Sequence, residues 1–266
     1  MAGSKRVLVT GAGRAIGFAT VQVLAQRGHR VIATARDTST LSALEGIEVC
    51  QLDVTDQASV DACLAQAGEL DAIVNNAALA RTGPAEDYPL QGFRDMFETN
   101  ALGALRIIQA LLPKWRERGS GVIVNVSSVN GQVGSPMEAA YGASKFALEA
   151  ITEALHYEVR HFGIRSVIIQ PGYIAPGMKP SGRHDGPPAY AELWAQWTGA
   201  DGKMLGTGGR PGPEIVGEAI ANAIEDPATP LRVPVGADAK MILGARRAMD
   251  DQAFEAAMRQ VLKLTW

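Results

Sequence analysis

Two ionisable residues stand four positions apart in a stretch of otherwise small and apolar side chains. The stretch reads "AAYGASKFAL" over residues 139–148, and the two residues are Tyr141 and Lys145. On a helix, this spacing places them one turn apart on the same face. A free tyrosine has a pKa of about 10, and a nearby ammonium group lowers that pKa by stabilising the phenolate. We therefore expect Lys145 to make Tyr141 a usable general acid and base.

Short β-branched runs alternate with longer amphipathic stretches along the chain. The strand candidates are "RVLVT", "RVIATA", "IEVCQLDV", "DAIVNNA", "GVIVNVSS", "RSVIIQPG" and "LRVPVG", and the helix candidates are 15–27, 57–67, 92–116, 139–162 and 213–225. Nearly continuous apolar strands separated by helices indicate a parallel sheet that is covered on both faces. The pattern predicts a single α/β domain over residues 1–266, with a doubly wound sheet of seven strands. Ligands bind such sheets beyond the carboxyl ends of the strands.

Composition excludes several classes of protein. The chain has 266 residues, of which 47% are hydrophobic and 20% charged, as in an ordinary globular protein with one large core. The net charge is −3 without a basic block, so neither nucleic acid nor a membrane surface is an expected partner. Cys50 and Cys63 lack metal-ligand spacing and are expected to be buried thiols. Neither a signal peptide nor a membrane span is expected, which predicts a cytoplasmic protein.

A glycine-rich turn, "VLVTGAGRAIGFAT", lies between the first strand and the first helix. Backbone N–H groups and the helix dipole at such a turn favour a pyrophosphate, which indicates a dinucleotide. The spacing Gly11-x-x-x-Ala15-x-Gly17 differs from the common G-x-G-x-x-G. On this motif alone, a tight turn without a ligand remains the alternative.

Arginines occupy the positions that select between the two nicotinamide dinucleotides. Arg36 ends the second strand, where an acidic residue would pair with a ribose hydroxyl and an arginine accommodates a 2′-phosphate. Arg14, in the glycine turn, can approach the same phosphate. Together they favour NADP over NAD. The alternative is that both are solvated surface charges.

One segment breaks the alternation of strands and helices. Residues 171–213 contain ten glycines and seven prolines, and within them we expect a substrate lid at about 173–213. The lid carries Tyr173, Met178, Tyr190, Trp194 and Trp197. The last three share one face of a short helix, which forms either an apolar wall of the substrate pocket or a stripe that packs the lid onto the core or a second subunit.

Seven motifs resemble those of the short-chain dehydrogenase/reductase family in order and spacing: "TGAGRAIG", "LDVTD", "NNAA", "ETNALGALRI", "NVSS", "YGASK" and "QPG". The resemblance covers about residues 5–172 and implies a Rossmann-type fold and a catalytic set of Asn100, Ser128, Tyr141 and Lys145. Ser128 is preferred to Ser127 because the family's serine lies 13 residues before the tyrosine. The expected cofactor-binding set is Gly11, Arg14, Ala15, Ile16, Gly17, Arg36, Asp53, Val54, Asn75, Ala77, Tyr141, Lys145, Pro171, Gly172 and Ile174, and the expected substrate-binding set is Ser128, Tyr141, Tyr173, Tyr190 and Trp194.

The resemblance also implies roles for these residues. Ser128 would orient the substrate oxygen, Lys145 would also contact the nicotinamide ribose, and Asn100 would hold a proton-relay water. Asp53 would lie near the adenine and Asn75 beside the cofactor. Two positions depart from the family: Ala15 replaces a glycine, and Pro176 replaces a threonine expected near the nicotinamide carboxamide.

The expected reaction is the NADP(H)-dependent interconversion of an alcohol with a ketone or aldehyde. The tail "LRVPVGADAKMIL" resembles the hydroxysteroid and retinol dehydrogenase-like branch, which implies a mainly apolar substrate. Two alternatives remain open, a ketoacyl-thioester reductase of the same fold and a non-catalytic NADPH sensor. The family also implies a homodimer or homotetramer joined through 92–116 and 139–162. Isolated histidines, among them His29, are expected on solvated faces.

Overall fold

The computed structural model describes residues 3–176, 182–205 and 208–266, which form a Rossmann-type domain around a seven-stranded sheet. All neighbouring strands are parallel, in the order β3-β2-β1-β4-β5-β6-β7. The strands are β1 (Arg6–Val9), β2 (Arg30–Ala35), β3 (Glu48–Gln51), β4 (Ala72–Asn75), β5 (Gly121–Val126), β6 (Ile164–Pro171) and β7 (Arg232–Val235). The strand order reverses between β1 and β4, which places a ligand crevice at their carboxyl ends. The predicted fold and strand number are confirmed.

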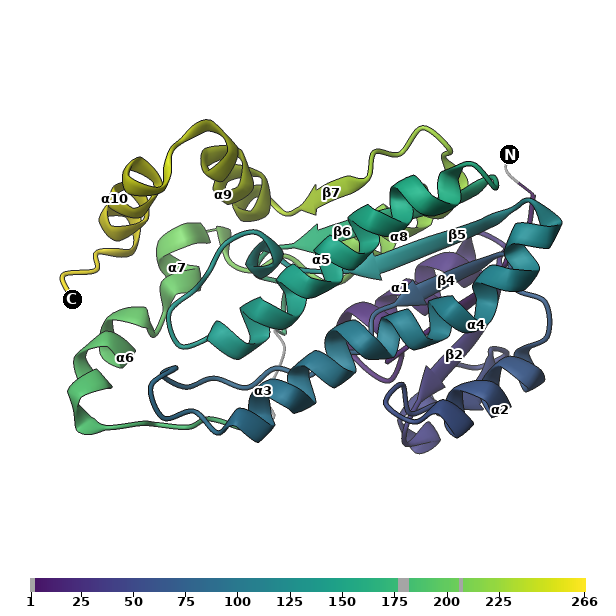
Figure 1. The fold of residues 1–266 in the computed structure, drawn as a ribbon, viewed down its shortest axis with the longest axis horizontal. Helices are drawn as coiled ribbons and strands as arrows, with labels where there is room; N and C mark the ends of the chain where they lie inside the picture. The colour runs from purple at the N-terminus through teal and green to yellow at the C-terminus, as the bar shows by residue number, and fades with distance from the viewer. Residues whose placement is uncertain (1–2, 177–181, 206–207) are drawn as a thin grey trace.

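Helices cover both faces of the sheet (Figure 1). They are α1 (Ala15–Gln26), α2 (Gln57–Ala67), α3 (Leu90–Phe97), α4 (Gly103–Arg118), α5 (Ala139–Arg160), α6 (Ala191–Trp197), α7 (Ala200–Leu205), α8 (Glu214–Glu225), α9 (Ala237–Ala248) and α10 (Asp251–Leu262). Side chains alternate between the faces along each strand, so Val7 and Val9 pack with α1 and α8 whereas Leu8 packs with α2 and α4. The apolar run of β1 is thus buried on both sides.

The helix predicted over 92–116 is divided by a wider turn. A π-helical segment, Glu98–Leu102, separates α3 from α4 and contains the buried Asn100. Such turns are frequent at functional sites. The turn lets Asn100 face inward at the start of α5, as described below.

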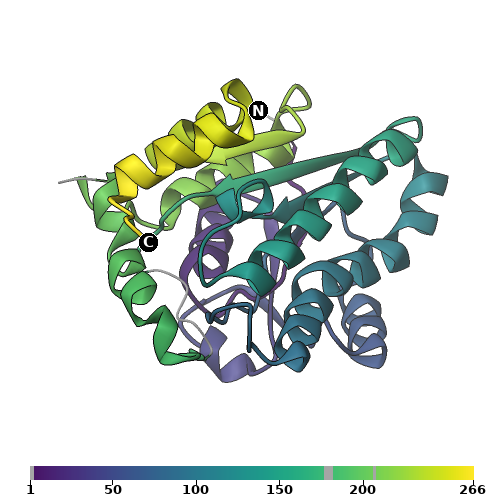
Figure 2. The same ribbon diagram turned by 60° about the vertical axis from the view of Figure 1, so that its left-hand side comes forward.

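The described part of the segment after β6 contains regular structure within its glycine- and proline-rich sequence. It contains a 3₁₀ turn (Pro188–Tyr190) followed by α6 and α7. Two C-terminal helices, α9 and α10, follow β7 and were not among the predicted elements. Figure 1 shows α6, α7, α9 and α10 gathered beyond the carboxyl ends of the strands, and Figure 2 shows the C-terminal chain returning to α6. These helices surround the edge of the sheet where ligands are expected.

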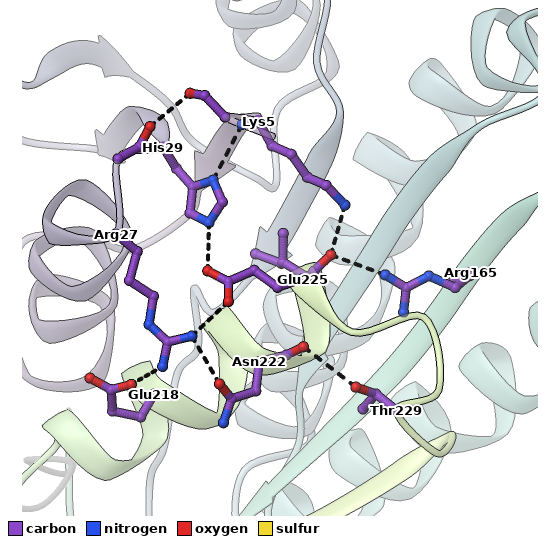
Figure 3. A network of polar contacts seen from close by, with 11 residues as sticks. Lys5, Arg27, His29, Arg165, Glu218, Asn222, Glu225 and Thr229 are labelled. Atoms are coloured by element: carbon purple, nitrogen blue, oxygen red, sulfur yellow. Dashed lines mark hydrogen bonds and ion pairs between the residues drawn. The ribbon is translucent and has the colours of Figure 1, made fainter. Parts of the chain in front are cut away.

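His29 is buried, which corrects its predicted place on a solvated face. Its side chain is 2% exposed, Nδ1 accepts from the backbone N–H of Lys5 at 3.2 Å, and Nε2 lies 3.0 Å from Glu225 Oε1 (Figure 3). Arg27 pairs with the same carboxylate at 2.9 Å. The network joins the start of β1 to the end of α8, at the opposite end of the strands from the ligand crevice. Burial between these elements, which are distant in sequence, explains why the local pattern was misleading.

Candidate active site

A cavity of about 450 Å³ lies at the carboxyl ends of β1 to β4. Ten residues of the predicted cofactor set line it: Gly11, Arg14, Ala15, Ile16, Gly17, Arg36, Asp53, Val54, Ala77 and Ile174. Gly13, Asp37, Thr40, Asn76, Leu79, Thr99 and Ala175 also line it and were not predicted. The added residues flank predicted ones in the sequence or come from the turns after the same strands. Within the described chain, this cavity is therefore the candidate dinucleotide site.

The glycine turn has space for backbone atoms only. Gly11 has a φ of +65°, and a Cβ there would lie 2.8 Å from Ala77 Cα. A Cβ on Gly17 would collide with the Gly11 carbonyl oxygen. The N-terminus of α1 has no side-chain cap from Arg14, so its backbone N–H groups face the cavity edge without that competitor. The cradle fits a pyrophosphate at a helix N-terminus.

Ala15, the departure from the glycine expected there, adopts a φ of +46°. A side chain in this left-handed region costs about 1 kcal/mol relative to its ordinary conformation. The methyl group therefore adds backbone strain beside the phosphate cradle. The turn keeps the conformation that glycine would adopt without this cost.

Two exposed arginines and one aspartate set the charge at the adenosine end of the cavity. Arg14 and Arg36 both line it. Asp37 also lines it, but its carboxylate accepts the backbone N–H of Ser39 at 3.0 Å and caps a 3₁₀ turn (Thr38–Leu41). Because the Asp37 carboxylate is hydrogen-bonded within its own turn, the guanidinium groups of Arg14 and Arg36 are the side chains suited to bind a 2′-phosphate.

Asp53 lines the cavity at the end of β3 and is fixed by its own loop. Its Oδ1 accepts from Thr55 N at 2.9 Å and from Thr55 Oγ1 at 2.7 Å. Partial burial works against ionisation, but the Thr55 hydrogen bonds and the charge of Arg36 together hold the pKa of Asp53 below its ordinary value. The carboxylate is an oriented, ionised acceptor.

Asn75, which was predicted to lie beside the cofactor, is not among the residues that line the cavity. It ends β4 opposite Asn125, and its Nδ2 donates to Asn125 Oδ1 at 2.8 Å. The next residue, Asn76, lines the cavity and donates to the carbonyls of Thr10 and Gly11 at 2.9 and 3.1 Å. Strand alternation separates the two asparagines, and Asn76 is the one that holds the glycine turn.

Tyr141 lies on the first turn of α5, opposite the end of β5. The Ser128 hydroxyl is within hydrogen-bonding reach of the Tyr141 hydroxyl, whereas Ser127 points the other way and donates to Glu149. Lys145 Nζ lies 5.8 Å from the centroid of the Tyr141 ring and donates to the carbonyl of Val126 at 2.8 Å. The structure thus brings Ser128, Tyr141 and Lys145 together between β5 and α5.

The electrostatics of this group differ from the expectation for Tyr141. Burial raises the pKa of Tyr141 well above its ordinary value, Glu138 adds to the rise, and Ser128 only partly offsets it. Burial also lowers the pKa of Lys145 to about 8, against the opposing charge of Glu149. In the protein alone the net shift of the Tyr141 pKa is upward, and the predicted lowering by Lys145 beside a bound nicotinamide stays a prediction. Desolvation dominates, and the Lys145 ammonium is directed at a backbone carbonyl rather than at the phenol.

Asn100 forms hydrogen bonds that join two parts of the site, and it is not among the residues that line the cavity. Its Nδ2 donates to the carbonyl of Leu79 and to Ser144 Oγ, both at 2.9 Å, and its Oδ1 accepts from Leu79 N at 2.7 Å. Ser144 Oγ in turn donates to the Tyr141 carbonyl at 2.6 Å. Both amide hydrogens are used, so the side chain positions the start of α5 against the loop after β4.

The turn after β6 is held by a buried acid that the sequence pattern did not single out. Asp238, in the first turn of α9, accepts the backbone N–H of Tyr173 at 2.7 Å. A Cβ on Gly172 would collide with the same carboxylate. Pro171 ends β6 and Gly172 follows it outside the cavity lining, whereas Ile174 and Ala175 reach the cavity. The signal for Asp238 was an acidic residue just after the last strand candidate.

Tyr190 and Trp194, two aromatic residues of the lid, contact residues that do not line the cavity. Tyr190 Oη donates to Glu86 Oε2 at 2.6 Å, and the Tyr190 ring stacks on Trp266 with centroids 6.2 Å apart. The Trp194 ring lies 4.2 Å from the Arg183 guanidinium. Neither ring is among the residues that line the cavity, and the contact of Tyr190 and Trp194 with a substrate stays a prediction. Met178 lies outside the described residues, and Tyr173 contacts Arg210 at 5.5 Å.

Among the residues that the structure describes, no helix is long and apolar enough to cross a membrane, and no cluster of three or more His, Cys, Asp or Glu residues could hold a metal ion.

The chain is similar in sequence and fold to known proteins. Residues 5–186 match the family model described as short chain dehydrogenase. Retinol dehydrogenase 8 of Homo sapiens is 33% identical over 260 residues, which cover 87% of this chain and 81% of that protein. A crystal structure of a short-chain dehydrogenase from Streptomyces avermitilis has 35% identity and a TM-score of 0.82, with 98% of this chain and 97% of the other covered.

A second crystal structure, of a short chain dehydrogenase from Burkholderia cenocepacia, is in complex with NADP. It has 27% identity and a TM-score of 0.78, with 96% of this chain and 97% of the other covered. The family model covers more than half of the chain, and the solved structures share its whole fold. The chain belongs to the short-chain dehydrogenase family and is an oxidoreductase that acts on CH–OH or C=O groups.

Proposed function

We propose that the protein is an NADP(H)-dependent oxidoreductase that interconverts an alcohol with a ketone or aldehyde on a mainly apolar substrate. The observation that carries the proposal is the group of Ser128, Tyr141 and Lys145 between β5 and α5, with a dinucleotide-sized cavity along the same edge of the sheet. Two neighbouring hydroxyl groups beside an ammonium suit a reaction in which a proton and a hydride move together.

The preference for NADP(H) is supported by the charges around the cavity. Arg14 and Arg36 both line its adenosine end, and the nearby Asp37 carboxylate is engaged by Ser39. The related Burkholderia cenocepacia structure is in complex with NADP, which agrees with this assignment. The glycine cradle would hold the pyrophosphate, and Ile174 and Ala175 would contact the nicotinamide half of the cofactor.

The nicotinamide group supplies or accepts the hydride when bound. In the direction of reduction, Ser128 donates a hydrogen bond to the carbonyl oxygen of the substrate and Tyr141 Oη gives its proton to that oxygen. The raised pKa keeps Tyr141 protonated at neutral pH, as an acid requires. The positive charge of Lys145, 5.8 Å from the ring, then stabilises the buried phenolate that the transfer leaves behind. Asn100 and Ser144 hold the first turn of α5 in place.

A mainly apolar substrate is supported by the relationship to retinol dehydrogenase 8, whose name describes an apolar alcohol as its substrate. Tyr173 lies two residues after the end of β6 and next to the cavity-lining Ile174. Among the lid aromatics in the predicted substrate set, it is the one whose neighbour in sequence lines the cavity, so we assign it to the substrate site.

Absorbance at the NADPH band during incubation with a panel of apolar ketones, aldehydes and alcohols tests the proposal. Carbonyl-dependent oxidation of NADPH, with weaker or absent oxidation of NADH, is expected. A panel that gives no turnover with either cofactor contradicts the enzyme proposal and leaves the sensor alternative. Turnover confined to acyl thioesters instead assigns the ketoacyl-thioester reductase.

We also propose that copies of the chain associate through α3, α4 and α5. Phe97, Phe146 and Tyr157 are 41%, 45% and 75% exposed on this face, and side chains of this size gain from burial against an identical surface. Light scattering after size exclusion is expected to give a dimer or tetramer, and Phe146→Asp is expected to shift it toward the monomer. A monomeric wild-type protein contradicts the proposal.

A further inference from the structure

A buried carboxylate lies one helical turn beyond Lys145. Glu149 is 3% exposed and accepts four side-chain hydrogen bonds: from Ser127 Oγ at 2.9 Å, Gln132 Nε2 at 3.1 Å, Gln170 Nε2 at 2.8 Å and Arg232 Nε at 2.9 Å. An ionised carboxylate away from water is costly unless such partners satisfy it. Its burial inside the fold, with every oxygen engaged, sets it apart from an ordinary surface acid.

Two of these donors lie at the carboxyl ends of strands that lead to the reacting groups. Ser127 precedes Ser128 at the end of β5, and Gln170 lies in β6 just before the turn that leads to the cavity. The packing leaves no spare room, because a Cβ on Gly131 would meet the Ser127 hydroxyl and the Glu149 carboxylate. Glu149 therefore connects α5 to the carboxyl ends of two central strands.

The charges around Glu149 come from two sources. Arg232 approaches from β7, and its second partner is Glu153 Oε2 at 2.8 Å, on the next turn of α5 and 45% exposed. Lys145 lies on the preceding turn of α5. The other three donors to Glu149 are neutral side chains. They are Ser127 after β5, Gln170 in β6, and Gln132, which follows the 3₁₀ turn (Val129–Gly131). On the other side of Lys145, the titratable neighbour is Tyr141.

We propose that Glu149 is a positioning residue of the active site: its buried carboxylate keeps Lys145 in the ammonium form and holds the ends of β5 and β6 against the reacting groups. The inference rests on the proposed function, in which Lys145 acts as a cation. Arg232 moderates the effect, because its positive charge neutralises part of the Glu149 field.

The direction of the effect follows from the charges. Burial lowers the pKa of Lys145 to about 8, and Glu149 opposes that fall. Loss of the carboxylate charge therefore lowers the pKa further, whereas loss of the Arg232 charge raises it. Removing the Glu149 charge and removing the Arg232 charge therefore shift the pKa of Lys145 in opposite directions, which a purely structural role does not predict.

The test compares pH profiles of kcat/KM for NADPH-dependent carbonyl reduction between pH 6 and pH 10. In Glu149→Gln, the alkaline limb is expected to move to lower pH by about one unit. In Arg232→Met, it is expected to move to higher pH. Glu153→Gln removes the exposed partner of Arg232 and serves as the matched control, with a limb close to that of the wild type.

The inference is overturned if the alkaline limb of the pH profile stays at the wild-type pH in both Glu149→Gln and Arg232→Met. It is also overturned if the substitutions lower the rate by the same factor at every pH. If Glu149→Gln does not fold, the opposite shift in Arg232→Met carries the test. NMR titration of the Lys145 Nζ resonance, assigned from its absence in Lys145→Met, gives a readout without turnover. If the wild type lacks activity but this titration shifts as described, the proposed function fails and the electrostatic role of Glu149 stands.

Discussion

Lys145 Nζ lies 5.8 Å from the ring centroid of Tyr141 and donates its hydrogen bond to the Val126 carbonyl instead of to the phenol. The lysine is therefore held by the end of β5, with its charge close to the ring. We propose that in this geometry Lys145 stabilises the phenolate after proton transfer, whereas the neutral phenol is the ground state of the buried site. Five predictions follow from this site and its supports.

Alkaline stability tests the burial of Lys145. Its pKa is about 8 in the folded protein and about 10.5 when unfolded, so the unfolded chain binds more protons between these values. Stability should therefore gain on the order of 2 kcal/mol as pH rises through this window, relative to Lys145→Met. Denaturant titrations of both proteins at pH 7.5 and pH 10 measure the difference. A difference in unfolding free energy that stays constant with pH contradicts a buried, charged Lys145.

Cofactor choice depends on Arg36. Arg36→Ala should weaken NADPH binding by about 10- to 100-fold, because a charge-assisted contact to the 2′-phosphate is lost, and should leave NADH binding nearly unchanged. Arg30→Ala, at the opposite end of β2, is the matched control. Fluorescence titration with both nucleotides gives the affinities. Equal losses for NADPH and NADH would show that Arg36 does not contact the 2′-phosphate.

Replacing Ala15 with glycine should remove the backbone strain at this position. Ala15→Gly permits the φ of +46° without a side-chain clash and clears the methyl group from the phosphate cradle, so NADPH should bind several-fold more tightly. Ala25→Gly, near the end of α1, should instead lower the free energy of unfolding by about 1 kcal/mol and leave cofactor affinity unchanged. Weaker NADPH binding in Ala15→Gly would mean that the methyl group supports the turn.

Asp238 should link stability to cofactor affinity. Asp238→Ala removes the acceptor of the Tyr173 N–H, and the cavity-lining Ile174 and Ala175 follow directly. We expect a loss of about 1–3 kcal/mol in unfolding free energy and a roughly tenfold higher Kd for NADPH. Asp250→Ala provides the control, because Asp250 caps α10 by accepting Ala253 N at 2.8 Å. That change should cost about 1 kcal/mol of stability with no change in Kd.

The sheet was predictable because each central strand is buried on both faces and therefore reads as a continuous apolar run, as in "GVIVNV" of β5. The glycine cradle and the Tyr141 and Lys145 spacing were visible for a similar reason, since each depends on residues close in sequence. The helices α9 and α10 were missed because they bury a narrow stripe, with Phe254 and Leu262 as the buried residues of α10.

Properties set by distant contacts could not be obtained from local pattern. His29 is buried by α8, which lies almost 200 residues further along the chain. Asn75 and Asn76 are adjacent in sequence, and what separates their roles is the direction in which the backbone at the end of β4 points each side chain. The raised pKa of Tyr141 depends on how completely α5 is packed, and the importance of Glu149 depends on Arg232 from the last strand.

The central claim is that Tyr141 delivers the proton to the substrate oxygen. Single-turnover oxidation of bound NADPH by a saturating carbonyl substrate, in the wild type and in Tyr141→Phe, measures this step, with Tyr157→Phe on the exposed side of α5 as the control. The account predicts that Tyr141→Phe binds NADPH as the wild type does and oxidises it about 10²- to 10⁴-fold more slowly, and that Tyr157→Phe is unaffected. A Tyr141→Phe protein that oxidises NADPH at the wild-type rate would contradict it.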